Sequence, residues 1–310
     1  MTPPSVRSNT VAIELNAVLV ALTADEPLVL TLEDGAVLPS GPFESEHPTL
    51  QTGVRAWVER QTRHPLGYVE QLYTFADRNR AAPQSGGRVV SISYLGLTRE
   101  RLSAGPRDPE WRSWYRYFPW EDWRDGPSPL VRQTILPRLA KWVAAADDPA
   151  AKRDRKQRVE VNFGDGRKDW NEDLVLQRYE LLYEAALVPE AGDPAVDPLP
   201  GMPMRHDHRR ILATGIARLR AKIKYRPVVF ELMPPEFTLL QLQRAVEALA
   251  GRPLHKQNFR RLIDQQGLVE ETGAISSETG GRPAKLFRFR REIVLERAAG
   301  GSKLPLSRPA

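Results

Sequence analysis

The stretch from Phe237 to Arg290 constrains the fold of this 310-residue chain more than any other segment. Thr238 and Gln241, three positions apart, have the form of a capping box, and apolar residues then recur at helical spacing. The sequence Ala250-Gly251-Arg252-Pro253 ends this pattern, because glycine accepts a left-handed backbone and proline cannot continue the helical hydrogen bonds. A helix with one buried stripe is therefore expected, followed by a short turn.

A second helix is expected to begin near His255. Three of its apolar residues are expected to be buried: Phe259, Leu262 and Ile263. Two runs of strand-forming residues follow, at 268–272 and 285–290, and the turn between them contains Gly280-Gly281-Arg282-Pro283. Helix, turn, helix and hairpin in this order predict a winged helix-turn-helix. The expected DNA contacts are its polar and basic residues: Lys256, Gln257, Asn258, Arg260, Arg261, Arg282 and Lys285.

The charge distribution favours nucleic acid as the partner of this segment. From His206 to the end the chain has 20 Lys and Arg against 10 Asp and Glu, whereas the net charge of the whole chain is +6. The first 205 residues therefore carry a net charge of −4, and the basic excess is local, as in a phosphate-binding module. Two other interpretations stay open: basic side chains that only solvate a small α+β domain, and a module that binds RNA or another protein.

Composition limits the remaining possibilities. The chain is long enough for two domains, and its 41% of hydrophobic residues can supply ordinary cores. It has no cysteine, which excludes disulfides and thiolate metal sites, and no apolar run approaches the roughly 20 residues of a membrane span. The start, Met1-Thr2-Pro3-Pro4-Ser5, lacks the charged and apolar regions of a signal peptide. A cytoplasmic protein without a membrane partner is therefore expected.

Strand patterns dominate the first hundred residues. The expected strands are 11–15, 17–22, 28–32, 67–73 and 89–97, and a helix follows Leu50. This order predicts a mixed α/β domain. Counted from Gly41, Arg55 lies fourteen positions on and Glu59 eighteen. The spacing resembles the Nudix box, which runs Gly, five residues, Glu, seven residues, then Arg-Glu-apolar-X-Glu-Glu-X-Gly.

The departures from the Nudix box predict an inactive site. One of its four glutamates remains, Glu59, and Arg60 stands where the last should be. Nudix hydrolysis needs these carboxylates to hold divalent metal ions, so neither catalytic nor metal-binding residues are assigned, and Arg60 is expected to replace the metal's charge. One alternative is a structural ion pair between Arg55 and Glu59, four residues apart. The other is a divergent hydrolase of ADP-ribose or a dinucleotide, whose metal ligands would be Glu44, Glu46 and Glu59.

Several segments carry a resemblance to a known family: Leu72-Tyr73-Thr74-Phe75, residues 88–95, Phe237-Thr238-Leu239-Leu240-Gln241-Leu242, Asn258-Phe259-Arg260-Arg261 and Gly281-Arg282-Pro283-Ala284. Over about residues 10–100 and 205–291 the chain resembles the Nudix-related transcriptional regulators of bacterial NAD metabolism. The middle hundred residues have no counterpart in the shorter members of this family. In having this insertion, the chain is similar to a longer subgroup, the alphaproteobacterial repressors of NAD biosynthesis. The resemblance implies a homodimeric repressor that binds double-stranded operator DNA and senses ADP-ribose, NAD or ATP, with no cofactor required.

The resemblance also implies the fold and the nucleotide site. A Nudix-like α/β/α sandwich is expected over 1–225, with a helical insertion at about 100–204 and a connecting helix at 206–225, followed by a winged helix at 226–296 and a flexible tail at 297–310. Without a metal ion, cations must contact a pyrophosphate. The candidate ligand residues are Arg55, Glu59, Arg60, Tyr73, Phe75, Arg78, Arg80 and Arg88. Tyr73 and Phe75 suit stacking on a base, but as alternating strand residues they suit a core equally well.

The insertion has two unusual runs. Residues 110–123 hold four of the chain's seven tryptophans, which is typical of a core or an interface. Residues 152–158 are rich in Lys and Arg, which favours either an auxiliary phosphate contact or a solvated helix end or loop. Helices are expected at 135–146 and 170–187. His206 and His208, just after the insertion, make a poor metal site because they lack a nearby carboxylate pair, and no metal is assigned.

Overall fold

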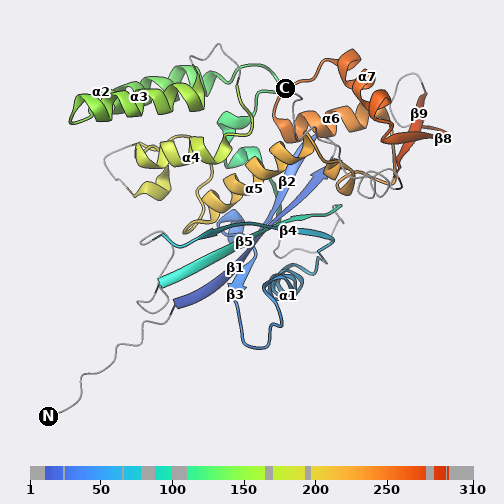
Figure 1. Cartoon of the computed structure of the whole chain (residues 1–310), viewed down its shortest axis with the longest axis horizontal. Coiled ribbons are helices and arrows are strands. Elements are labelled where there is room, and N and C mark those ends of the chain that lie inside the picture. The colour runs from blue at the N-terminus through green and yellow to red at the C-terminus, as the bar shows by residue number, and fades with distance from the viewer. Residues whose placement is uncertain are drawn as a thin grey trace, which may run out of the picture.

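The computed structural model describes residues 11–23, 25–64, 66–77, 88–99, 110–164, 170–192, 197–276, 283–290 and 292. A mixed sheet comes first, a helical segment follows, and a smaller unit of helices and short strands ends the chain (Figure 1). In these ranges no helix is long and apolar enough to cross a membrane.

One long strand organises the N-terminal sheet. β1 (Val11–Thr23) pairs in parallel with β5 (Arg88–Leu97) and antiparallel with both β2 (Glu26–Thr31) and β3 (Ser40–Pro42). The edges are β4 (Tyr68–Phe75), beside β5, and β6 (Glu110–Ser113), beside β2. The expectation of separate strands at 11–15 and 17–22 was wrong. Pairing with β5 continues through Asn16, which lies opposite Ser93, so the two segments form one strand.

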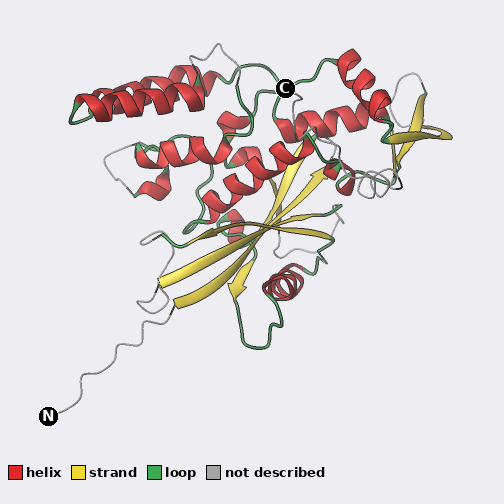
Figure 2. Ribbon diagram, viewed as in Figure 1, coloured by secondary structure: helices red, strands yellow, loops and turns green. Residues whose placement is uncertain are grey.

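Helices cover both faces of this sheet, as Figure 2 shows. Alternate residues of β1 point to opposite sides. Leu15 and Leu19 pack with α1 (Leu50–Thr62) in one cluster, whereas Val18 packs with α5 (His208–Ile223) in another. The arrangement is the expected α/β/α sandwich.

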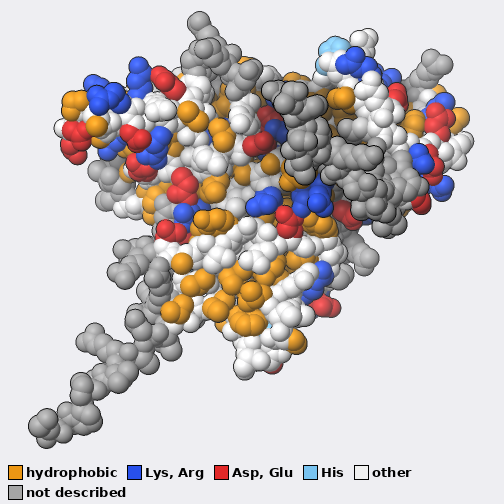
Figure 3. Space-filling model, in the orientation of Figure 1, with side chains coloured by type: hydrophobic (Ala, Val, Ile, Leu, Met, Phe, Trp, Pro, Cys, Tyr) orange, Lys and Arg blue, Asp and Glu red, His pale blue; other side chains and the backbone are white. Residues whose placement is uncertain are grey.

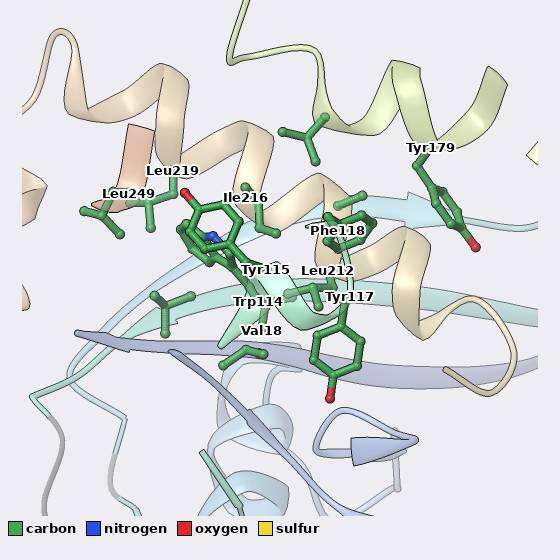
Figure 4. Packing of buried hydrophobic residues seen from close by; sticks show 14 of the residues in the cluster. Val18, Trp114, Tyr115, Tyr117, Phe118, Tyr179, Leu212, Ile216, Leu219 and Leu249 are labelled. Atoms are coloured by element: carbon green, nitrogen blue, oxygen red, sulfur yellow. The ribbon is translucent and has the colours of Figure 1, made fainter. Parts of the chain in front are cut away.

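The insertion forms a helical layer beside α5. After the short helices η2 (Trp114–Arg116) and η3 (Pro119–Glu121), a π-helical turn η4 (Val131–Ile135) leads into α2 (Leu136–Ala144). α3 (Pro149–Phe163) packs on α2, and α4 (Val175–Glu184) lies between α3 and α5. The aromatic run contributes to the core, since Trp120 and Trp114 (the latter labelled in Figure 4) are fully buried. The basic run 152–158 is part of α3, so it is neither a loop nor a helix end.

The C-terminal unit is a winged helix-turn-helix. It contains η6 (Val228–Glu231), β7 (Glu236–Phe237), α6 (Leu239–Ala250), α7 (Lys256–Gln266), β8 (Val269–Ser276) and β9 (Ala284–Phe289). The three strands form one sheet in the order β7-β9-β8. The capping box is confirmed: Thr238 accepts from the Gln241 amide, and the Gln241 side chain accepts from the Thr238 amide. Gly251 ends α6 with a left-handed φ of +71°.

Candidate DNA interface and nucleotide site

The second helix of the winged helix presents a polar surface. Phe259 is 8% exposed and anchors α7 to the core, together with the partly buried Ile263. The predicted DNA contacts on this helix are all exposed: Lys256, Gln257, Asn258, Arg260 and Arg261. Figure 3 shows basic side chains over α7 on the face in view. Among the described residues, no carboxylate pairs with the three cations of this helix, so their charges are available to phosphates.

Leu262 departs from the sequence expectation. It was expected to be buried, but 51% of it is exposed. Phe259 and Ile263 define the buried side of α7, and at about 100° per residue Leu262 lies on its flank, about 60° round the helix from Phe259 and about 100° from Ile263. The buried stripe of this helix is therefore narrower than its sequence suggests.

The wing is held by ion pairs across its hairpin. Lys285, a predicted DNA contact on β9, lies 2.8 Å from the carboxylate of Glu271 on β8. Arg288 pairs with Glu270 in the same way, at 2.6 Å. Lys285 is exposed, so it must exchange Glu271 for a phosphate if it is to contact DNA. Arg282 lies outside the described residues.

The Nudix-box spacing falls on β3 and α1, where Trp57 occupies the space beside the glycine. The indole covers Gly41 so closely that a Cβ there would lie 2.2 Å from the ring. Its Nε1 donates to the Pro42 carbonyl oxygen at 2.8 Å, and the Arg60 guanidinium lies 4.5 Å from the ring centre. An aromatic ring thus covers the glycine of the box and a cation lies against that ring, where a hydrolase needs carboxylates and metal ions.

Arg55 and Glu59 do not form the structural ion pair. The Arg55 guanidinium donates to the carbonyl oxygens of Leu66 and Gly67, the latter at 3.1 Å, and thereby ties α1 to the start of β4. It is therefore engaged with the backbone, and its role as a phosphate ligand stays a prediction. Glu59 is exposed.

The carboxylates of the hydrolase alternative are not assembled into a site. Glu44, Glu46 and Glu59 all lie in the described part of the chain, where no group of three His, Asp or Glu side chains is placed to hold a metal ion. Glu44 instead lies beside His47, whose Nδ1 accepts from the Glu44 amide at 3.1 Å.

The two candidate stacking residues differ in exposure. Phe75 is 3% exposed and packs in the core with the Arg210 guanidinium 4.4 Å from its ring centre, so it is a core residue and not a base-stacking one. Tyr73 is 56% exposed, and its ring centre lies 4.8 Å from that of Phe75. Arg78, Arg80 and the side chain of Arg88 lie outside the described residues.

Two features were missed by the sequence reasoning. His208, considered only as a poor metal ligand, is buried, and its Nδ1 accepts from the Leu38 amide at 2.8 Å. Burial lowers the pKa of His208 to about 3. The second feature is a fully buried cluster of Glu121, Arg178 and Arg220. Two signals of this cluster are present in the sequence: Glu121 is a charged residue in the aromatic run, and Arg220 is a charged residue on a helix that faces the sheet.

Fold and site together define a two-part protein: a Nudix-like α/β/α sandwich with a helical insertion, followed by a winged helix-turn-helix. The family model of the NrtR DNA-binding winged helix domain matches residues 229–289, so the C-terminal unit is a winged helix of the NrtR type.

Comparisons with individual proteins agree with the two-part fold and with the winged helix. An ADPR responsive transcriptional repressor NtrR of Acinetobacter baylyi is 45% identical over 83 residues, which are 27% of this chain and 33% of the relative. The matched region thus spans about a third of the relative's length. NrtR of Shewanella oneidensis matches in fold over 90% of this chain and 94% of its own, with 19% identity and a TM-score of 0.54. A MutT/nudix family protein of Enterococcus faecalis matches over 91% and 89%, with 16% identity and a TM-score of 0.51.

Proposed function

We propose that this protein is a transcriptional repressor of NAD metabolism genes that binds operator DNA through its winged helix and is controlled by a nucleotide in its Nudix-like domain. The observation that carries the proposal is the NrtR-type winged helix at 229–289, whose second helix exposes three cations without carboxylate partners in the described part of the chain. The crystal structure of Shewanella oneidensis NrtR with a 27mer DNA matches this chain in fold with a TM-score of 0.51, and it supports DNA as the proposed partner.

A homodimer places two copies of α7 in successive major grooves of a pseudo-palindromic operator, about 34 Å apart. Asn258 and Gln257 have the amide groups that recognise adenine edges, and Lys256 and Arg261 suit guanine or phosphate. Because phosphate contacts release counterions, operator affinity falls steeply as the salt concentration rises.

ADP-ribose is the first effector to test, since the Acinetobacter relative is named as ADPR responsive, and NAD and ATP follow from the family resemblance. Glu59, Arg60 and Tyr73 are the described candidates that remain exposed for a nucleotide. The Nudix-like domain acts as a sensor without hydrolysis, because Trp57 covers Gly41 and Arg60 lies against Trp57 where metal-binding carboxylates would be needed.

The test is an electrophoretic mobility assay of the full chain with DNA from upstream of NAD biosynthesis genes, titrated with ADP-ribose, NAD and ATP. Nucleotide hydrolysis is followed in the same samples with Mg²⁺ or Mn²⁺ present. Specific retardation that one nucleotide changes, without turnover, supports the proposal. Metal-dependent turnover without specific retardation would establish the divergent hydrolase instead.

A further inference from the structure

The C-terminal end of α6 is held by groups outside the winged helix. The hydroxyl of Tyr115 donates to the Ala248 carbonyl oxygen at 2.6 Å, Arg220 Nε donates to the Leu249 oxygen at 2.9 Å, and the Trp123 amide donates to the Gly251 oxygen at 2.7 Å. The last carbonyls of a helix lack partners within the helix and form the negative end of its dipole. Two donors from the insertion and one arginine from α5 thus supply hydrogen bonds to the carbonyl oxygens at the end of α6, the first helix of the helix-turn-helix.

Arg220 is itself fixed by a buried cluster of charges. The Glu121 carboxylate accepts from Arg178 at 2.6 and 2.7 Å and from Arg220 at 2.8 Å. Glu121 is 1% exposed and both arginines are fully buried. Removing one partner of such a cluster leaves an uncompensated buried charge, so the arrangement tolerates little displacement. We call the group Tyr115, Glu121, Trp123, Arg178 and Arg220 the α6 seat.

The α6 seat is continuous with the edge of the N-terminal sheet. β6 ends at Ser113, and Tyr115 of the seat follows two residues later. Figure 4 shows Trp114 and Tyr115 between Val18 of the sheet and Leu249 of α6. A movement of the β2–β6 edge therefore has a short path to the first helix of the helix-turn-helix, through two residues of chain and the hydrogen bond from Tyr115 to Ala248.

A second connection runs beside the first. Arg124, three residues after η3, pairs with Asp122 at 2.7 Å and with Glu26 of β2 at 2.9 Å. Arg244 of α6 lies 3.8 Å from Asp25, in the turn before β2. Asp25, Arg124 and Arg244 line a cavity of about 380 Å³ between the turn, the insertion and α6. The same edge of the sheet thus contacts both the insertion and the winged helix.

We propose that the insertion is the coupling element of this protein, and that its α6 seat transmits the state of the sheet domain to the orientation of the winged helix. The inference rests on the proposed function, because coupling needs two ligands whose affinities depend on each other. It assigns a role to residues 114–124: they set how a nucleotide changes operator affinity without touching either ligand.

The test compares Tyr115→Phe with Tyr117→Phe. Both changes remove one buried hydroxyl that donates to a backbone carbonyl oxygen, but the Tyr117 hydroxyl donates to Gly35 of the sheet domain, at 2.9 Å. Operator affinity and nucleotide affinity are measured separately and together for each full-length variant. For Tyr115→Phe we expect each separate affinity to stay within about twofold, while the factor by which the nucleotide changes operator affinity falls about threefold or more. Tyr117→Phe should keep the wild-type factor.

Hydrogen exchange gives a second readout that needs no nucleotide effect. In Tyr115→Phe, amides of residues 247–254 should exchange faster than in Tyr117→Phe, whereas those of β8 and β9 should not. A wild-type coupling factor together with unchanged exchange at 247–254 would overturn the inference. If no nucleotide changes operator binding even in the wild type, the sensing part of the proposed function fails. In that case, hydrogen exchange at residues 247–254 by itself shows whether the α6 seat fixes the end of α6.

Discussion

Gly251→Ala tests the close approach of the helix-turn-helix to the α6 seat. Gly251 has a left-handed φ of +71°, which costs alanine about 1 kcal/mol. A Cβ at this position would also lie 2.5 Å from the Glu121 carbonyl oxygen and 2.6 Å from Arg220 Nη2. A backbone oxygen cannot rotate away as a flexible side chain can, so overpacking adds about 1–3 kcal/mol. The variant should therefore lose about 2–4 kcal/mol of unfolding free energy.

Gly192 provides the matched control. Its φ is also +71°, but a Cβ there would meet nothing within 4 Å. Gly192→Ala should therefore lose only the backbone contribution of about 1 kcal/mol. Urea unfolding followed by tryptophan fluorescence reports on the region directly, since Trp123 belongs to the α6 seat and Trp120 precedes Glu121 in the chain. Equal losses in the two variants would refute the close approach of Gly251 to Glu121.

Three further predictions concern other parts of the molecule. Arg261→Ala should weaken operator binding by about 1–3 kcal/mol, whereas Lys141→Ala, an equal charge change at an exposed position of α2, should not; equal effects would remove Arg261 from the interface. Burial lowers the pKa of His208 from 6.5 to about 3, so below pH 6.5 the unfolded chain binds a proton that the folded chain does not. The stability from this group is then lost as the pH falls from 6.5 towards 3, by up to about 1.4 kcal/mol per pH unit, and urea midpoints of His208→Gln should lack this slope. Arg60→Ala should weaken ADP-ribose binding, measured by calorimetry, about tenfold, while Arg63→Ala should not change it. An unchanged affinity in Arg60→Ala would mean that Arg60 only stacks on Trp57.

Local signals in the sequence predicted the C-terminal unit well. The capping box at Thr238, the glycine after Ala250 and the strand patterns each depend on residues within a few positions of one another. The helix after Leu50 was predicted for the same reason, whereas the α/β/α sandwich was implied by the family resemblance. The errors at Asn16 and Leu262 arose where a tertiary contact decides: pairing with β5 joins two strand segments, and the narrow contact of α7 leaves a leucine exposed.

The nucleotide site was predicted less well. Sequence spacing placed Arg55 and Arg60 on one helix, but it did not show that Arg55 binds two carbonyl oxygens or that Trp57 covers Gly41. The α6 seat was beyond any local pattern, because Glu121 meets Arg178 and Arg220 across 57 and 99 positions of the chain. Only the fold brings such charges together.

The docking of α6 also limits how this protein can evolve. A winged helix taken from a relative and grafted after residue 225 would have to offer three carbonyl oxygens in the same places, with no side chain at the position of Gly251. A mismatch would leave the Nε of Arg220 without its acceptor in a site that is fully buried. New operator specificity is therefore easier to reach by single substitutions along the exposed side of α7 than by exchange of the whole domain.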